Sequence, residues 1–155
     1  MAALTLISPI GPLHVVADRE RIIRFGFGPA TQADEPSPLA DAAACWVAAY
    51  FAGNPRPFDL PLAPSQTAFQ ANVRAAMLAI PFGETRSYGE IAKDVAGSAR
   101  AVGQACGRNP VPILVPCHRV LGAGGALGGF SGGEGRATKR RLLAHEASFA
   151  FALTP

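Results

Sequence analysis

The segment Pro116–Val120 places a cysteine directly before a histidine, and such a pair can carry out nucleophilic chemistry. A thiol becomes a strong nucleophile when it loses its proton, and an imidazole can accept that proton. An apolar run at 111–115 leads into the pair, and the prolines at 112 and 116 disfavour a helix or a central strand. We therefore expect Cys117 on a bent, fixed segment that faces a pocket. The alternative is a small buried cysteine beside an unrelated histidine.

Composition bounds the class of protein. The chain has 155 residues, enough for one or two small domains, and 49% of them are apolar, which supports a core. The longest apolar run is far too short for a membrane span, and no secretory signal is visible. The three cysteines (Cys45, Cys106 and Cys117) cannot all pair, and the scattered histidines form no zinc pattern. We expect no metal and no cofactor, and a cytoplasmic protein whose thiols stay reduced.

The net charge of +3 is unevenly distributed. Residues 1–80 hold 5 Lys/Arg and 6 Asp/Glu, whereas residues 81–155 hold 9 and 5, so the second half is net +4. Positive charge concentrated in the half that contains the Cys-His pair is typical of a protein that binds a polyanion. A charge this small also occurs in many other soluble proteins.

The first part of the chain has the patterns of a small sheet and one helix. Apolar runs at 13–17 and 22–27, separated by a polar turn, predict a β-hairpin. Residues 39–51 have small and apolar side chains at helical spacing. Residues 55–64 contain four prolines and predict an extended linker, so we place a domain boundary there.

The second part is predicted to be mainly helical. A helix is expected over about 65–80, and Ser87 with Glu90 forms the pattern of a capping box. The helix that follows is expected to be broken by Gly97, with Ser98 capping another helix. Two short helices joined by a glycine-bearing turn predict a helix-turn-helix, although a purely structural helix pair has the same pattern.

The end of the chain combines a flexible loop with a basic helix. Eight of the fourteen residues from 122 to 135 are glycine, which predicts a loop that allows the backbone to approach a ligand closely. Residues 136–147 predict a basic helix, whose cationic side chains (Arg136, Lys139, Arg140 and Arg141) have the pattern of a solvated face.

Six motifs together resemble one protein family. In order and spacing they are similar to the O6-alkylguanine-DNA alkyltransferases, also called methylated-DNA–protein-cysteine methyltransferases. The resemblance is dense from about 67 to 146 and thinner from 4 to 62. The motifs are Tyr88–Ala92, Arg100–Gly103, Arg108–Ile113, Pro116–Val120, Ser131–Gly133 and Leu142–Glu146.

The resemblance implies an α/β fold in two domains. Residues 1–60 would form a ribonuclease H-like domain with a small sheet and a helix. Residues 61–155 would form a mainly helical domain with a helix-turn-helix that binds DNA and carries out alkyl transfer. The implied partner is double-stranded DNA bearing O6-alkylguanine, with O4-alkylthymine as an open second substrate. A monomer is expected, and cooperative binding to DNA is left open.

The family's chemistry implies roles for four residues. Cys117 would take the alkyl group, with His118 as its base through a water molecule and Glu146 orienting the histidine. Asn109 would brace the turn that carries the cysteine. The product would be a thioether, which nothing in the sequence could reverse, so the protein would act once as a suicide enzyme.

The resemblance also implies which residues handle the DNA. Arg100 would replace the flipped nucleotide in the duplex, a base-flipping step that costs a few kcal/mol of unstacking. Ala101, Ser87 and Tyr88 would lie against the DNA with it. The guanine pocket would be lined by Tyr88, Cys106, Val120, Phe130, Ser131 and Gly132. No role is assigned to Cys45 or His145.

Three other functions remain open. A non-transferring protein could bind damaged DNA and flag it, although Cys117 argues against this. A cysteine hydrolase could use Cys117 and His118 on a small ester or amide. A helix-turn-helix regulator would leave the cysteine without a role. Transfer of one methyl group to the protein without turnover would favour the alkyltransferase.

Overall fold

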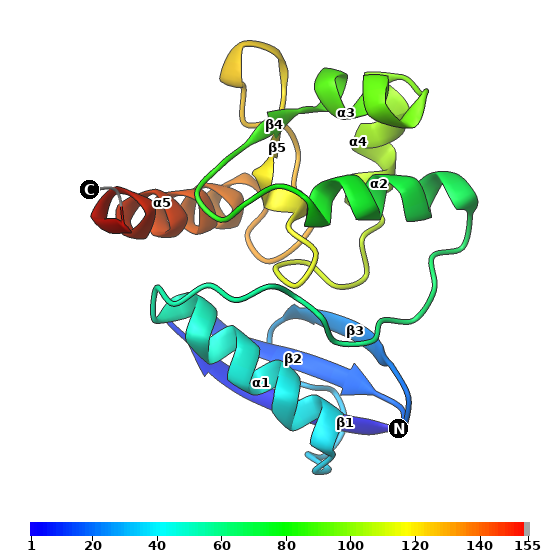
Figure 1. The fold of residues 1–155 in the computed structure, drawn as a ribbon. Coiled ribbons are helices and arrows are strands. Elements are labelled where there is room, and N and C mark those ends of the chain that lie inside the picture. The colour runs from blue at the N-terminus through cyan, green and yellow to red at the C-terminus, as the bar shows by residue number, and fades with distance from the viewer. Residues whose placement is uncertain (154–155) are drawn as a thin grey trace. The chain divides into compact units, whose positions relative to one another are not determined.

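The chain divides into two compact units, Met1–Ala63 and Pro64–Pro155 (Figure 1). The computed structural model describes the backbone of residues 1–153 and the side chains of residues 1–149. The last two residues of the predicted second domain lie outside the described residues.

The first unit contains a three-stranded antiparallel sheet. Its strands are β1 (Ala2–Ser8), β2 (Gly11–Ala17) and β3 (Ile22–Phe27), in the order β1-β2-β3. The predicted hairpin of β2 and β3 is confirmed, with Val15 opposite Phe25. The strand β1 was not predicted, because it has few β-branched residues and its Ile7 is 87% exposed. Its pairing along the whole of β2 compensates for this weak local signal.

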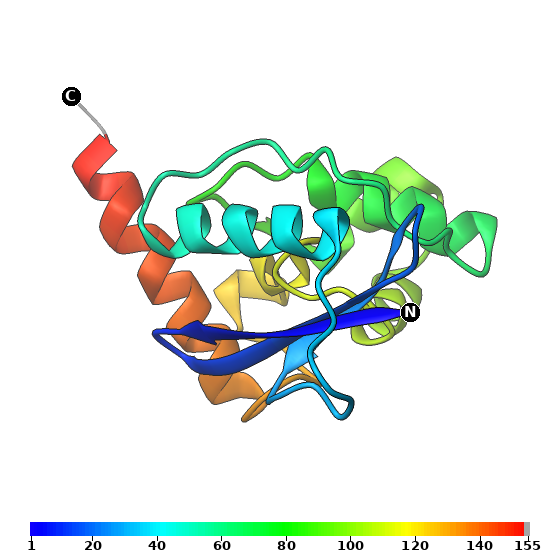
Figure 2. The same cartoon turned by 90° about the horizontal axis from the view of Figure 1, so that it is seen from below.

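The helix α1 (Pro38–Phe51) covers one face of this sheet (Figures 1 and 2). Its Ser37 side chain accepts a hydrogen bond from the Ala40 amide and caps the helix. The buried side chains recur at helical spacing, and most are small enough for the helix to lie close to the strands. They are Ala40, Ala43, Val47 and Tyr50.

The end of the proline-rich linker pairs with the first residue of β3. The Ile22 amide donates to the Pro61 carbonyl at 2.8 Å, and the Ala63 amide donates to the Ile22 carbonyl at 2.8 Å. The predicted extended conformation of residues 55–64 is therefore confirmed at its end, where these bonds hold it against the sheet.

In the second unit three helices gather at one end and α5 (Arg136–Leu153) lies at the other, with the yellow segment around residue 117 between them (Figure 1). The three helices are α2 (Ala68–Leu78), α3 (Tyr88–Val95) and α4 (Ala99–Gly107). The helix α2 starts later than predicted because Thr67 caps it by accepting from the Gln70 amide.

The predicted capping box and the predicted turn between α3 and α4 are both present. Ser87 and Glu90 exchange both bonds of the box. The residue in the left-handed conformation is Ala96, at φ 55°, and not Gly97. Gly97 is required for a different reason, because a Cβ there would lie 2.7 Å from Cε2 of Phe69. The glycine thus allows the turn to pack closely on α2.

Two very short strands join distant parts of this unit. The strand β4 (Arg86–Ser87) pairs in parallel with β5 (Val120–Leu121), a pairing too short to be predicted from sequence. Between α4 and β5 the chain forms a buried run and the 3-10 helix η1 (Cys117–Arg119). The glycine-rich loop contains one more short turn, η2 (Ala123–Gly125). The pairing brings the start of α3 next to the segment that follows the cysteine.

Candidate active site

The segment that leads to Cys117 is held in one conformation by Asn109. The Asn109 side chain donates to the Val115 carbonyl at 2.9 Å and accepts from the Val111 amide at 3.1 Å. Within this segment Ile113 is fully buried and has φ 74°, a left-handed conformation that is unfavourable for a β-branched residue. Such a conformation persists only where the surroundings fix it. The expected bent and fixed segment is therefore present.

Cys117 lies at the start of η1 and is 6% exposed. Burial raises the pKa of its thiol, and a hydrogen bond from Asn109 and the positive charge of Lys139 act in the opposite direction. The net effect keeps the resting group a thiol. Its reaction as a nucleophile therefore needs a base.

His118 and Glu146 form a buried pair between η1 and α5. Nε2 of His118 is hydrogen-bonded to Oε2 of Glu146. The other carboxylate oxygen accepts from the Gly83 amide at 3.0 Å and from Nε of Arg119 at 2.8 Å. The carboxylate thus receives three donors, which fix both its position and its charge.

These contacts determine the protonation of the pair. Burial acts to raise the pKa of Glu146, but the hydrogen bonds and charges of His118 and Arg119 lower it to about 2. Burial lowers the pKa of His118. We assign a neutral imidazole that donates its Nε2 hydrogen to an ionised carboxylate. In this tautomer Nδ1 is the ring nitrogen that can accept a proton.

Lys139 corrects one sequence-based expectation. Its place in a basic helix was consistent with a solvated position, but the side chain is fully buried on α5. Its Nζ donates to the carbonyl of Val120 at 2.6 Å, to the hydroxyl of Tyr88 at 3.3 Å and to the carbonyl of Gly129 at 3.4 Å. Burial lowers the pKa of Lys139 and the two nearby thiols raise it.

A signal for the burial of Lys139 was present in the sequence. Lys139, Leu142 and Glu146 are three and four residues apart and all three are buried, so they share one face of α5. The arginines at 136, 140 and 141 are exposed, as expected for a solvated face. Arg119 was also missed as a functional residue, because its partners are distant in sequence.

Tyr88 lies at the start of α3 and is held between Lys139 and the glycine-rich loop. Nζ of Lys139 lies 5.5 Å from the centre of the Tyr88 ring. A Cβ at Gly128, where φ is 72°, would lie 2.8 Å from the tyrosine hydroxyl. Burial, followed by the charges of Cys106 and Cys117, raises the pKa of Tyr88. The hydroxyl is therefore a donor at neutral pH.

The other expected pocket residues are in different environments. Cys106 is 7% exposed, its Sγ lies 3.6 Å from Sδ of Met77, and burial raises its pKa to about 12. The Ser131 hydroxyl donates to the carbonyl of Gly107 at 3.1 Å, which ties the loop to the end of α4. Phe130 and Gly132 are half-buried in the same loop.

The residues expected to contact DNA lie at helix starts. Arg100 is exposed in the first turn of α4. The Ala101 amide donates to the Ser98 side chain at 3.1 Å, and Ser87 is occupied in the capping box. Arg100 is therefore an exposed side chain at a capped helix end.

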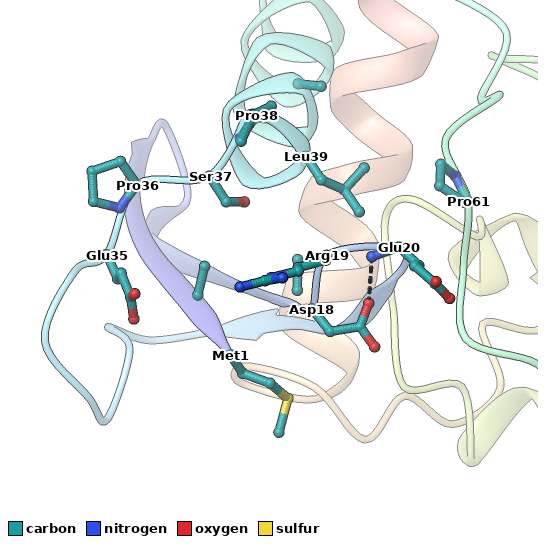
Figure 3. A pocket seen from close by; sticks show the side chains of 13 residues that line it. Met1, Asp18, Arg19, Glu20, Glu35, Pro36, Ser37, Pro38, Leu39 and Pro61 are labelled. Carbon is teal, nitrogen blue, oxygen red and sulfur yellow. Dashed lines mark hydrogen bonds between the residues drawn. The ribbon is translucent and has the colours of Figure 1, made fainter.

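A separate pocket of about 700 Å³ lies in the first unit (Figure 3). Asp18, Glu20 and Glu35 line it with Pro36 and Leu39, and the Glu20 amide donates to Asp18 at 2.8 Å. No predicted site residue belongs to this lining. Among the described residues there is also no group of three or more His, Cys, Asp and Glu placed to hold a metal ion. No described helix is long and apolar enough to cross a membrane.

Fold and site together define a protein with a buried Cys-His-Glu arrangement next to a helix-turn-helix. Residues 3–64 match the ribonuclease-like domain and residues 68–148 the DNA binding domain of 6-O-methylguanine DNA methyltransferase. The chain belongs to this family, whose curated relatives are named methylated-DNA–protein-cysteine methyltransferases.

Individual relatives span nearly the whole chain. The one from Mycobacterium tuberculosis is 47% identical over 152 residues, covering 93% of this chain and 91% of its own. The one from Methanosarcina acetivorans is 44% identical over 135 residues, covering 81% and 86%. The crystal structure of Mycobacterium tuberculosis OGT in complex with DNA superposes with a TM-score of 0.82 at 42% identity, covering 96% of this chain and 94% of the other.

Proposed function

We propose that this protein repairs DNA by taking O6-alkylguanine out of the duplex and transferring the alkyl group irreversibly to Cys117. The observation that carries the proposal is the buried hydrogen bond between His118, which directly follows the fixed Cys117, and Glu146 of α5. Family membership supports the substrate, because curated relatives carry the name methylated-DNA–protein-cysteine methyltransferase.

The first step makes the nucleophile. The Cys117 thiol passes its proton toward Nδ1 of His118, and the Glu146 carboxylate stabilises the imidazolium that forms. The sulfur then attacks the alkyl carbon, the bond from that carbon to O6 breaks, and a carbon–sulfur bond forms. The electron pair of the broken bond goes to the purine.

The second requirement is to stabilise the departing purine. The Tyr88 hydroxyl donates to a ring nitrogen on which negative charge develops. Lys139 supports this donation, because its Nζ lies 3.3 Å from the phenolic oxygen. The Val120 carbonyl, which already accepts from Lys139, has a second lone pair for the exocyclic amine of guanine.

The remaining pocket residues shape the space around the base. Phe130 supplies aromatic surface and Cys106 apolar volume, and backbone groups near Ser131 and Gly132 provide donors for O6. Asn109 holds the segment that ends in Cys117. None of these groups gains or loses a proton in the proposed transfer.

Binding to the duplex is assigned to the ends of α3 and α4. Arg100 enters the base stack in place of the flipped nucleotide, and Ala101 and Ser87 keep the capped helix ends close to the backbone. The exposed position of Arg100 in the first turn of α4 supports this role. Residues 61–155 thus carry both DNA binding and transfer, and residues 1–60 form the companion domain.

The product explains why each molecule acts once. A thioether has no good leaving group, so the carbon–sulfur bond is stable once it has formed. A cytoplasmic location is proposed with it, since a reducing compartment keeps Cys117 available.

The test is a titration of O6-methylguanine duplex against a fixed amount of protein. We expect the guanine that is restored to reach a plateau at one equivalent per protein molecule, even with excess substrate. Continued release of product beyond one equivalent would instead indicate a hydrolase.

A further inference from the structure

Arg119 is a buried cation that contacts the Glu146 carboxylate, a backbone carbonyl and an aromatic ring. Its Nε donates to Oε1 of Glu146 at 2.8 Å, and its Nη1 donates to the Ile80 carbonyl at 2.7 Å. The guanidinium carbon lies 5.8 Å from the centre of the Phe82 ring. The side chain as a whole is 8% exposed. The proposed transfer chemistry does not use this group directly.

These contacts join three segments of the second unit. Ile80 and Phe82 follow α2, Arg119 ends η1, and Glu146 belongs to α5. The Gly83 amide adds a further bond from the first of these segments to the same carboxylate oxygen. A planar guanidinium can span two acceptors in fixed directions, which an ammonium cannot do. Arg119 therefore sets where the carboxylate lies.

The charges around His118 also depend on Arg119. Glu146, Arg119 and Lys139 face the imidazole from α5 and η1, and Cys117 is its neighbour in the chain. The carboxylate attracts a proton to His118, whereas the two cations repel it. Arg119 balances the charge of Glu146, so the imidazole remains neutral and basic.

We propose that Arg119 is a positioning residue, which fixes the Glu146 carboxylate against His118 and balances its charge so that His118 acts as a neutral base. This inference rests on the proposed function for its link to alkyl transfer. It assigns Arg119 no contact with the substrate.

The test compares Arg119→Met with wild type in two measurements. The first is the NMR titration of His118 in the full-length protein without DNA. Removing the cation leaves the carboxylate unbalanced, so the pKa of His118 should rise. The second is the single-turnover rate with free O6-benzylguanine as a function of pH, whose acidic limb should move to higher pH. At neutral pH the rate should fall about tenfold to a hundredfold, part of what a positioned base contributes.

Two further variants separate positioning from general stability. Arg119→Lys keeps the charge but cannot reach both acceptors, so it should retain the wild-type acidic limb with a reduced rate. In a Glu146→Gln background, Arg119→Met should lower the single-turnover rate little further, because the carboxylate that Arg119 positions is no longer present. Arg24→Met, an exposed change in the first unit, controls for the loss of one positive charge.

An unchanged His118 titration in folded Arg119→Met would overturn the proposal, as would fully additive losses in the double variant. If wild type transferred no alkyl group, the proposed function would fail, yet the His118 titration would still report on Arg119. If Arg119→Met failed to fold, Arg119→Gln, which also removes the cation, would provide the same two readings.

Discussion

The reactivity of Cys117 depends on a balance between burial and its polar neighbours. Burial favours the neutral thiol, whereas Asn109 and Lys139 favour the thiolate. In the proposed mechanism His118 supplies the base, and its hydrogen bond to the buried carboxylate of Glu146 holds it in position.

Lys139→Met should slow alkyl transfer strongly while leaving the protein folded. The change removes a cation from beside Tyr88 and Cys117, and losing one such preorganised donor costs about a hundredfold in rate. The measurement is the single-turnover rate with free O6-benzylguanine, which avoids any effect on DNA binding. Arg140→Met, an exposed change on the same helix, is the matched control. Equal rates for Lys139→Met and wild type would remove Lys139 from the chemistry.

At the scale of elements, the helix-turn-helix depends on close packing of its turn against α2. Gly97 allows this packing because a Cβ there would lie 2.7 Å from Cε2 and 3.1 Å from Cζ of Phe69. Capping bonds at Ser87 and Ser98 fix the starts of the two helices. The elements thereby present Arg100 and Tyr88 from rigid helix ends.

Gly97→Ala should lower the free energy of unfolding by about 1–2 kcal/mol, since the half-buried Phe69 ring must move. Gly89→Ala is the control, because its Cβ would meet only the Ser87 hydroxyl oxygen at 3.8 Å. In α3 that change should be neutral or stabilising by up to about 1 kcal/mol. Chemical denaturation measures both, and equal stabilities for the two variants would show that the Phe69 contact is unimportant.

Arg100→Ala should slow transfer from duplex DNA much more than transfer from free O6-benzylguanine. The proposed task of Arg100 is to replace the flipped nucleotide, and a free base has no stack to leave. Single-turnover rates on both substrates give the comparison. An equal loss on both would assign Arg100 to the fold or the pocket instead of base extrusion.

Sequence was informative where structure is local. The capping pair Ser87 and Glu90 is three residues apart, so its bonds could be predicted from the pattern alone. Arg119 could not be interpreted in the same way, because its acceptor at Ile80 is 39 residues away. The spacing of Lys139 from Leu142 and Glu146 was a signal for its burial, but its acceptor at Val120 is 19 residues away and could not be predicted. The family resemblance implied the roles of Cys117, His118 and Glu146. The contacts that Arg119 and Lys139 make around them could be seen only once η1 and α5 were packed together.

At the scale of the whole molecule, the buried ionised groups link stability to pH. The pKa of Glu146 falls from an ordinary 4.5 to about 2 on folding, so the unfolded chain binds more protons between these values. The stabilisation is complete above pH 4.5 and is lost as pH falls toward 2. Burial of neutral His118 acts in the same direction at higher pH, below its ordinary 6.5.

Acid unfolding should therefore depend on Glu146. The lowered pKa corresponds to about 3 kcal/mol of stabilisation that disappears across this range. Glu146→Gln should be less stable at neutral pH, and its free energy of unfolding should change less between pH 4.5 and 2 than that of wild type. Denaturant unfolding at each pH measures this dependence. A wild-type slope in the variant would assign the acid sensitivity to other carboxylates.

The central claim is that the alkyl group ends on the sulfur of Cys117, and the most direct measurement is mass spectrometry after one turnover. The protein is mixed with duplex DNA containing O6-methylguanine, weighed intact and then mapped by proteolysis. We predict that each molecule gains one methyl group in place of a hydrogen, located at Cys117, and that Cys117→Ser gains none while still binding the duplex. A methyl group on Cys45 or Cys106, or an unmodified protein beside repaired DNA, would contradict the account.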